Sequence, residues 1–143
     1  MTKSLTNINV LDFSHALSGP FCSMLLAELG AKIIKIEPPH GDHFRPANGG
    51  ATFAVVNRNK RSLCLDLKQP SASIIMERLI SKCDVILENF TPGTMKRLGY
   101  HYEALKKMKP EIIYASISGF GSTGPYRDLK GYDAVAQAMS GIM

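Results

Sequence analysis

The fold of this chain is decided by the stretch Val10-Leu-Asp-Phe-Ser-His-Ala-Leu-Ser-Gly-Pro-Phe-Cys-Ser-Met-Leu-Leu-Ala-Glu-Leu-Gly30. It starts as a near-continuous apolar run, which is typical of a parallel strand covered on both faces. A polar turn follows at residues 15–19, and Pro20 then suits the first turn of a helix, where its missing N–H is not needed. We expect this helix to end at Gly30 and to bury one apolar face, made of Phe21, Met24, Leu25 and Leu29.

The first turn, residues 15–19, is the first candidate for a binding site. In open α/β sheets, ligands bind beyond the carboxyl ends of the strands, where such turns lie. For His15 itself two interpretations stay open at this point, a structural histidine of the core and a ligand contact.

Strands and helices alternate along the rest of the chain. We predict strands at Lys32–Glu37, 62–67, 84–88 and 111–118, and helices from 70 or 71 to 82, at 92–99, at Tyr102–Met108 and at 132–143. Residues 40–57 are predicted to form a long loop, whose end at 52–56 is either a helical turn or a strand. Because alternating elements form βαβ units, we predict an α/β fold, a Rossmann-like parallel sheet with helices on both faces.

Length and composition indicate one soluble globular domain. The chain has 143 residues, of which 45% are hydrophobic and 20% charged, as in ordinary soluble proteins. Without a signal peptide or an apolar run of about 20 residues, we expect a cytoplasmic protein with no membrane partner. The last helix shows no C-cap signal and no polar tail, so we interpret the chain as cut rather than finished.

The charge pattern favours an anionic small ligand, such as a phosphorylated cofactor, over nucleic acid. The net charge is +5, but nucleic-acid binding requires cations gathered on one face, and only Arg58, Lys60 and Arg61 cluster closely. The isolated cysteines, Cys22, Cys64 and Cys83, are typical of reduced structural thiols in the cytosol.

Two short motifs suggest chemistry that their contexts do not favour. Gly119-Phe-Gly-Ser-Thr-Gly124 matches the dinucleotide pattern Gly-x-Gly-x-x-Gly, but Pro125 follows at once and the acidic partner about 20 residues on would lie beyond the last residue. A flexible loop, or a lid whose Lys130 meets a phosphate, are the other interpretations.

His40-Gly-Asp-His43 offers too few ligands for a metal site, so we expect surface histidines and no metal. Further carboxylates form no obvious general acid–base pair and are expected at strand ends or caps: Asp12, Asp66, Asp84, Glu88 and Asp133.

A series of longer motifs resembles the family III CoA-transferases, the carnitine dehydratase and bile-acid-inducible group. The motifs are Val10-Leu-Asp-Phe-Ser-His-Ala-Leu-Ser-Gly-Pro20, Leu29-Gly-Ala-Lys-Ile-Ile-Lys-Ile-Glu37, Gly41-Asp42 with Arg45, Asn57-Arg-Asn-Lys-Arg-Ser-Leu-Cys-Leu-Asp-Leu-Lys68, Asp84-Val-Ile-Leu-Glu-Asn-Phe-Thr-Pro-Gly93, Gly119-Phe-Gly-Ser-Thr-Gly-Pro125 and Gly131-Tyr-Asp-Ala-Val-Ala-Gln-Ala-Met-Ser-Gly141. They cover essentially the whole chain in order. The resemblance implies that residues 1–143 are the N-terminal, CoA-binding part of the large domain, without the small domain and the C-terminal return.

The resemblance also implies an activity. Family members move CoA from an acyl-CoA to a carboxylic acid, through an acyl-aspartyl anhydride and an aspartyl-CoA thioester, which is nucleophilic covalent catalysis. The family's nucleophilic Asp would lie after Met143, so the resemblance implies no catalytic residue here and an inactive chain by itself. Members form interlocked homodimers, and this chain is too short to make that ring.

The family's contacts with coenzyme A fall, by motif position, on His15, Leu17, Ser18, Leu65, Lys68, Asn89, Phe90, Arg97 and Lys130. The residue types agree with that assignment, because Lys68, Arg97 and Lys130 are cations suited to phosphates. Phe90 offers an apolar face to adenine or to the pantetheine arm. One departure is Pro38, where some members carry an Arg that contacts the nucleotide.

Three alternatives remain open. The first alternative is a non-catalytic CoA- or nucleotide-binding module from a truncated or split gene. The second is an NAD-dependent enzyme, which rests on residues 119–124 alone. The third is an α-methylacyl-CoA racemase, whose acid–base His lies in a Gly-His-Asp segment. Tyr132 takes that position here, and its unperturbed pKa of about 10 suits proton transfer near neutral pH poorly.

Overall fold

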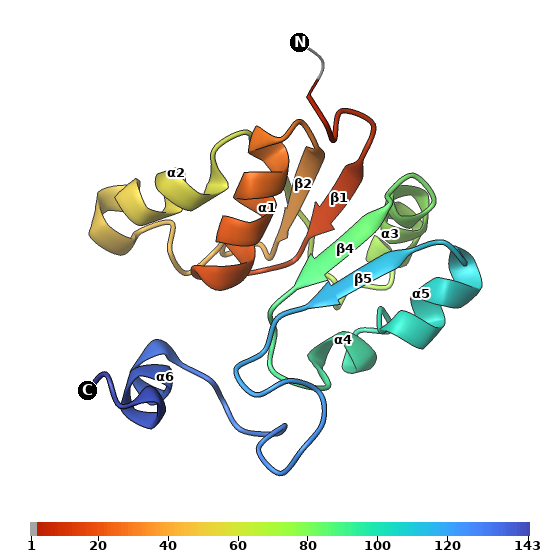
Figure 1. Ribbon diagram of the computed structural model, residues 1–143. Coiled ribbons are helices and arrows are strands. Elements are labelled where there is room, and N and C mark those ends of the chain that lie inside the picture. Colours follow the sequence, from red (N-terminus) through yellow and green to blue (C-terminus); the bar gives the residue numbers. More distant parts are fainter. Residues whose placement is uncertain (1–2) are drawn as a thin grey trace.

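A five-stranded parallel sheet organises the structure, a computed structural model that describes residues 3–143 (Figure 1). Its strands, in chain order, are β1 Asn9–Asp12, β2 Lys32–Glu37, β3 Lys60–Cys64, β4 Val85–Glu88 and β5 Ile113–Ser116. They lie in the order β3-β2-β1-β4-β5, and Val10 of β1 pairs with Ile33 of β2 and with Val85 of β4. The strand order therefore reverses between β1 and β4, which is where doubly wound sheets bind ligands.

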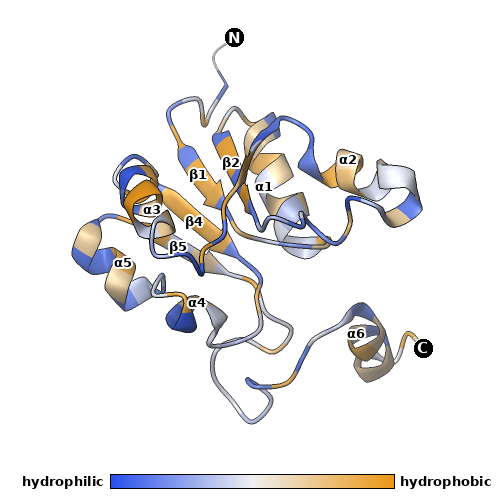
Figure 2. Ribbon diagram, turned by 180° about the vertical axis from the view of Figure 1, so that it is seen from behind, coloured by the Kyte–Doolittle hydropathy of each residue, from blue (hydrophilic) through white to orange (hydrophobic). Residues whose placement is uncertain are grey.

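Helices cover both faces of this sheet, as predicted. The helical elements of the described residues, in chain order, are α1 Ser18–Glu28, the 3₁₀ turn η1 Ala47–Gly50, α2 Ala51–Asn57, α3 Ala72–Ile80, α4 Thr94–Arg97, α5 Tyr102–Met108 and α6 Asp133–Ser140. Figure 1 shows α1 and α2 on one side of the sheet and α3, α4 and α5 on the other. Figure 2 shows hydrophobic residues concentrated along the central strands. The α/β, Rossmann-like prediction is confirmed.

Two buried clusters form the core, one on each face of the sheet. On the first face, Val10, Ile33 and Leu87 pack with Ala27 of α1. On the second face, the sheet packs against α3, α4 and α5 through a larger set: Leu11, Phe13, Ile36, Met76, Ile80, Ile86, Met95 and Leu105. Alternate residues of a strand point to opposite faces, so each apolar strand serves both clusters.

The prediction of which face of α1 is buried is wrong. Phe21, Leu25 and Leu29 are 48%, 46% and 51% exposed. The helix instead buries the smaller residues Gly19, Pro20, Ser23 and Ala27 together with Met24. Small side chains let the helix backbone lie close to the sheet. The large apolar side chains are left on the outer face.

Other element boundaries differ by a few residues from those predicted. The strand predicted at 62–67 runs from Lys60 to Cys64, and residues 52–56 belong to a helix, α2. The last helix does have a C-cap, because Gly141 adopts a left-handed backbone with φ of 78°. None of the side chains of α6 is buried, and the helix lies apart from the sheet (Figures 1 and 2). Among residues 3–143, no helix has the length and apolar character needed to cross a bilayer.

Candidate functional site

Asn89 joins the turns that follow β1 and β4, at the carboxyl edge of the sheet. The backbone N–H of His15 donates to Asn89 Oδ1 at 2.8 Å, and Asn89 Nδ2 donates to the His15 carbonyl at 2.8 Å. Asn89 Nδ2 also lies 3.4 Å from the hydroxyl oxygen of Ser18. The ring of Phe90 packs against the imidazole of His15, with centroids 5.1 Å apart. The structure thus brings together His15, Ser18, Asn89 and Phe90.

The close approach of these turns requires glycine at position 19. A Cβ atom on Gly19 would lie 2.2 Å from Ser14 Cβ and 3.3 Å from Asn89 Cγ. The backbone of Gly19 has an ordinary φ, so space rather than backbone conformation excludes a side chain. Gly19 therefore belongs to the site as a structural element.

Beneath the first turn, Asp12 is the centre of a buried polar network. Its carboxylate is fully buried and accepts hydrogen bonds from the hydroxyls of Ser14 and Ser23, the second at 2.5 Å. Lys60 of β3, whose side chain is 2% exposed, lies 3.0 Å from Asp12 Oδ2 and also donates to Asn57 Oδ1 at 2.9 Å. Burial lowers the pKa of Lys60, although Asp12 opposes that shift. Asp12 lies at a strand end, one of the two positions predicted, because it is the last residue of β1. Its hydrogen bonds also tie β1 to α1 and β3.

A second buried ion pair joins β2 to the loop after it. Lys35 Nζ lies 2.9 Å from Asp42 Oδ2 and donates to the carbonyl of Ser14 at 2.5 Å. Burial raises the pKa of the Asp42 carboxyl, but His15, the Phe44 amide and Lys35 outweigh burial and hold that pKa well below its usual value. Sequence reasoning missed Lys35, because a lysine in a strand is usually exposed.

Glu37, at the end of β2, anchors the same loop from its other side. Arg45 donates to both carboxylate oxygens of Glu37, at 2.6 and 2.8 Å, and Ser62 donates at 2.6 Å. Burial raises the pKa of Glu37, but these donors lower it more. The Arg45 guanidinium also lies over the ring of Phe53, 4.1 Å from its centroid, a cation–π contact. This bidentate pair fixes the chain that carries Asp42.

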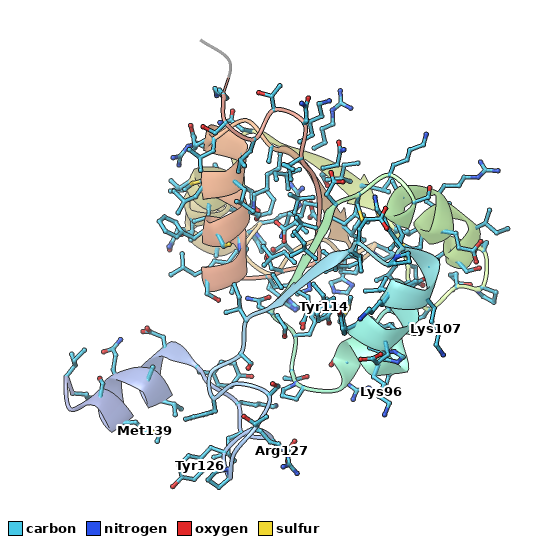
Figure 3. All side chains as sticks on the ribbon, turned by 45° about the vertical axis from the view of Figure 1, so that its right-hand side comes forward. Lys96, Lys107, Tyr114, Tyr126, Arg127 and Met139 are labelled. Atoms are coloured by element: carbon cyan, nitrogen blue, oxygen red, sulfur yellow. The ribbon has the colours of Figure 1, made fainter. Side chains whose placement is uncertain are left out.

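Glu88 orients the turn after β4. Its carboxylate accepts the Phe90 N–H at 2.8 Å and the hydroxyl of Tyr114 on β5 at 3.1 Å. Burial, followed by the charge of Glu88, raises the pKa of Tyr114, so the hydroxyl stays a donor. Figure 3 shows Tyr114 among the side chains at this edge of the sheet. Glu88, predicted as a strand-end carboxylate, therefore holds the backbone of Phe90 in place.

The remaining predicted contacts lie around this centre without joining it. Leu65 is half-buried and packs against the same core cluster as Phe90. Leu17 is 56% exposed, and Arg97 donates to Thr94 Oγ1 at 2.8 Å within α4. Within residues 3–143, no hydrogen bond or ion pair joins Lys68, Arg97 or Lys130 to the first turn.

The glycine-rich segment after β5 closes on itself rather than opening a helix. A Cβ atom on Gly119 would lie 2.3 Å from the Cα of Gly131, and the reverse distance is the same. The two backbones therefore touch, and residues 120–130 form a closed loop between them. Figure 3 shows Tyr126 and Arg127 on this loop, away from the sheet. The next helix begins only at Asp133, so the strand–glycine–helix context of a dinucleotide site is not present.

The two histidines of His40-Gly-Asp-His43 lie at the surface, as predicted. His40 and His43 are exposed, and their rings lie 5.9 Å apart. Asp42 points instead to the buried Lys35. In the part of the chain that the structure describes, no three His, Cys, Asp or Glu side chains are placed to hold a metal ion.

A separate cavity of about 610 Å³ lies at the opposite edge of the sheet, where the strands begin. It is lined by residues that include Asn9, Lys32, Arg61 and Lys82. Parallel sheets place their ligands at the carboxyl edge, and the interlocked polar groups lie there too. We therefore place the candidate site at the carboxyl edge of the sheet.

The strand order defines a Rossmann-like α/β protein whose switch point lies between β1 and β4, the place where proteins of this class bind ligands. The model of the CoA-transferase family III matches residues 5–143. The chain belongs to this family.

Curated relatives and solved structures agree with that assignment. The chain is 50% identical to an acetyl-CoA:oxalate CoA-transferase of Acetobacter aceti over 94% of its own length and 36% of the relative's. It is 46% identical to a formyl-CoA:oxalate CoA-transferase of Bradyrhizobium diazoefficiens, over 99% of this chain and 35% of that one. The chain thus spans about a third of the length of these relatives.

Among solved structures, a CaiB/BaiF family protein from Brucella suis superposes with a TM-score of 0.95. It is 37% identical and is matched over 100% of this chain and 40% of its own. A hypothetical protein from Mycobacterium tuberculosis gives a TM-score of 0.93 at 38% identity, over 98% of this chain and 39% of that one.

Proposed function

We propose that residues 1–143 form the CoA-binding part of the large domain of an enzyme that moves CoA from an acyl-CoA to a carboxylic acid. The observation that carries this proposal is the pair of hydrogen bonds by which Asn89 holds the backbone of His15 at the β1–β4 switch point. The chain that makes them matches the family over residues 5–143. The reaction needs a thioester held still at a defined edge of the sheet, and the hydrogen bonds of Asn89 to His15 hold the two turns at this edge together.

The predicted contact residues divide by chemistry. His15, Leu17 and Ser18 lie in or beside the first turn and would hold the thioester end of CoA. Leu65 and Phe90 share one apolar cluster and would take adenine or the pantetheine arm. The cations Lys68, Arg97 and Lys130 would meet the phosphates, and the planar guanidinium of Arg97 suits a bidentate contact.

The proposed reaction proceeds by covalent catalysis. A carboxylate oxygen of an Asp attacks the thioester carbonyl, which gives an acyl-aspartyl anhydride and the CoA thiolate. The thiolate then attacks the aspartyl carbonyl, which gives aspartyl-CoA and frees the first acid. A carboxylate oxygen of the acceptor acid then attacks the thioester carbonyl of aspartyl-CoA, which expels the CoA thiolate and gives a second mixed anhydride. The thiolate attacks the acceptor's carbonyl carbon in this anhydride, which gives the new acyl-CoA and releases the Asp carboxylate.

In this scheme residues 1–143 bind and orient the thioester, and the nucleophilic Asp belongs to a segment that follows them in the family. We therefore propose that this chain alone binds CoA without turnover, and that the complete enzyme works as a homodimer in the cytoplasm. The relatives named above both act on oxalate, so we propose a small dicarboxylic acid, oxalate, as the acceptor. Acetyl-CoA or formyl-CoA is the proposed donor.

A racemase is the weaker candidate at this site. Tyr132 would have to take the acid–base role, and its side chain is 63% exposed at the end of the closed glycine loop. An exposed phenol is poorly suited to proton transfer near neutral pH.

Isothermal titration calorimetry tests the binding proposal. We expect saturable binding of CoA to the chain and at least tenfold weaker binding in Arg97→Met and Lys68→Met. Lys107→Met is the matched control, because Lys107 is exposed on α5 and has no proposed contact with CoA; its affinity should be unchanged. Absence of CoA binding by the folded chain would overturn the proposal. A separate assay with acetyl-CoA and oxalate should show no product.

A further inference from the structure

A buried carboxylate faces an imidazole at the base of the first turn. Asp42 Oδ2 lies 3.7 Å from His15 Nδ1. Both atoms are buried. Among the described residues, His15 Nδ1 has no hydrogen-bond partner, whereas Asp42 Oδ2 forms an ion pair with Lys35. Buried polar atoms are normally paired, so the unpaired Nδ1 that faces this carboxylate needs an explanation.

Asp42 is the fixed member of this pair. Its Oδ1 accepts the Phe44 N–H at 2.9 Å, and its own N–H donates to Glu37 Oε2 at 3.2 Å. Lys35 lies 2.9 Å from Oδ2, and both side chains of this ion pair are at most 1% exposed. Removing one partner of a buried ion pair strongly destabilises the fold, because the other charge is left uncompensated. The Asp42 carboxylate is therefore fixed in position and stays ionised.

His15 is the adjustable member. Asn89 fixes its backbone and Phe90 packs on its ring, but the side chain is 23% exposed. A ring shift of about 0.8 Å would bring Nδ1 within hydrogen-bonding distance of Asp42. A neutral imidazole that donates through one nitrogen can only accept through the other.

We propose that Asp42 is a positioning residue for His15. It accepts the N–H of Nδ1 and so fixes the neutral tautomer in which Nε2 is left to accept a hydrogen bond from the ligand. Lys35 keeps Asp42 ionised. Because Lys35 also donates a hydrogen bond to the carbonyl of Ser14, it sets the distance between Asp42 and the first turn. With the proposed function, on which this step rests, the donor is an amide N–H of the pantetheine arm.

The tautomer is tested directly by nitrogen-15 NMR of the histidine rings in the ligand-free chain. We expect the His15 signals of an imidazole protonated at Nδ1. His40→Gln, a substitution of an exposed loop histidine, should leave these signals unchanged. Signals of the Nε2–H tautomer in the wild-type chain would overturn the proposal.

A double-mutant cycle then tests the link to the ligand. Asp42→Asn alone leaves Lys35 unpaired and endangers folding, so Lys35→Met/Asp42→Asn is used, which removes both charges. We expect this variant and His15→Ala each to weaken CoA binding about tenfold, and the triple variant to be no weaker than His15→Ala. Losses that simply add would overturn the positioning role.

Failure of this proposal is distinct from failure of the proposed function. A wild-type chain that binds CoA with His15 in the Nε2–H tautomer retains the function and loses the positioning role. A chain that shows the Nδ1–H tautomer and binds no CoA retains the positioning role and loses the function.

Discussion

Replacing Asn89 by Ala tests whether one side chain holds the two turns of the site together. The substitution removes both hydrogen bonds to the backbone of His15, each 2.8 Å long. A typical hydrogen bond contributes about 1 kcal/mol net, whereas a loss that leaves a donor unsatisfied costs about 1–3 kcal/mol, and the lower half of that range applies to a part-buried N–H such as that of His15. The His15 N–H loses its acceptor, so we expect the free energy of unfolding to fall by about 2–3 kcal/mol.

Urea denaturation, followed by circular dichroism, measures this change in the free energy of unfolding, and thermal denaturation measures the change in melting temperature. For a domain of this size, 1 kcal/mol corresponds to about 3 °C in melting temperature, so the thermal midpoint should fall by roughly 6–9 °C. Asn7→Ala is the matched control, because Asn7 is exposed in the turn before β1; its midpoint should change little. If Asn89→Ala destabilises the chain no more than Asn7→Ala does, the two hydrogen bonds between Asn89 and His15 do not stabilise the fold as we expect.

Three further expectations follow from single features of the structure. Gly119→Ala places a Cβ atom 2.3 Å from the Cα of Gly131, so it should open the glycine loop and increase its proteolysis by trypsin; unchanged cleavage rates would contradict the closed loop. Cys64 is exposed whereas Cys83 is buried, and burial raises the pKa of Cys83 to about 11. At pH 8, an alkylating reagent should therefore label Cys64 quickly and Cys83 only after denaturation, as mass spectrometry would show. The pKa of Asp42 is lower in the folded than in the unfolded chain, so its ionised form stabilises the fold above about pH 4 and the stabilisation is lost as the pH falls below that value. Lys35→Met/Asp42→Asn should flatten this decline in urea midpoints measured between pH 7 and pH 3, and an equally steep decline would refute the assignment.

Much of the architecture was predictable because local patterns and the fold agree. Apolar runs at β1 and β4 fit strands buried on both faces, and the prediction of β2 at Lys32–Glu37 is confirmed. The buried face of α1 was not predictable from periodicity, because a close approach to the sheet selects small residues such as Ser23 and Ala27 over Phe21. Here tertiary packing outweighed hydrophobicity.

The site was predictable in part for the same reason. His15 and Asn89 follow parallel strands, so their proximity follows from topology. The partners of Asp12 and Lys35 could not be read from the sequence, since Asp12 meets Lys60 across 48 positions and Lys35 meets Asp42 only through the path of the loop. One signal was present: each charge interrupts an apolar strand, where it must find a partner to be buried.

The carboxyl edge as the CoA site is tested most directly by backbone amide NMR of the nitrogen-15-labelled chain during titration with CoA. We predict that the shifted amides gather in residues 14–19, 65–68 and 89–97 and at Lys130. Shifts gathered instead around Asn9, Lys32 and Lys82, at the cavity on the opposite edge, or no shifts at saturating CoA, would contradict the account.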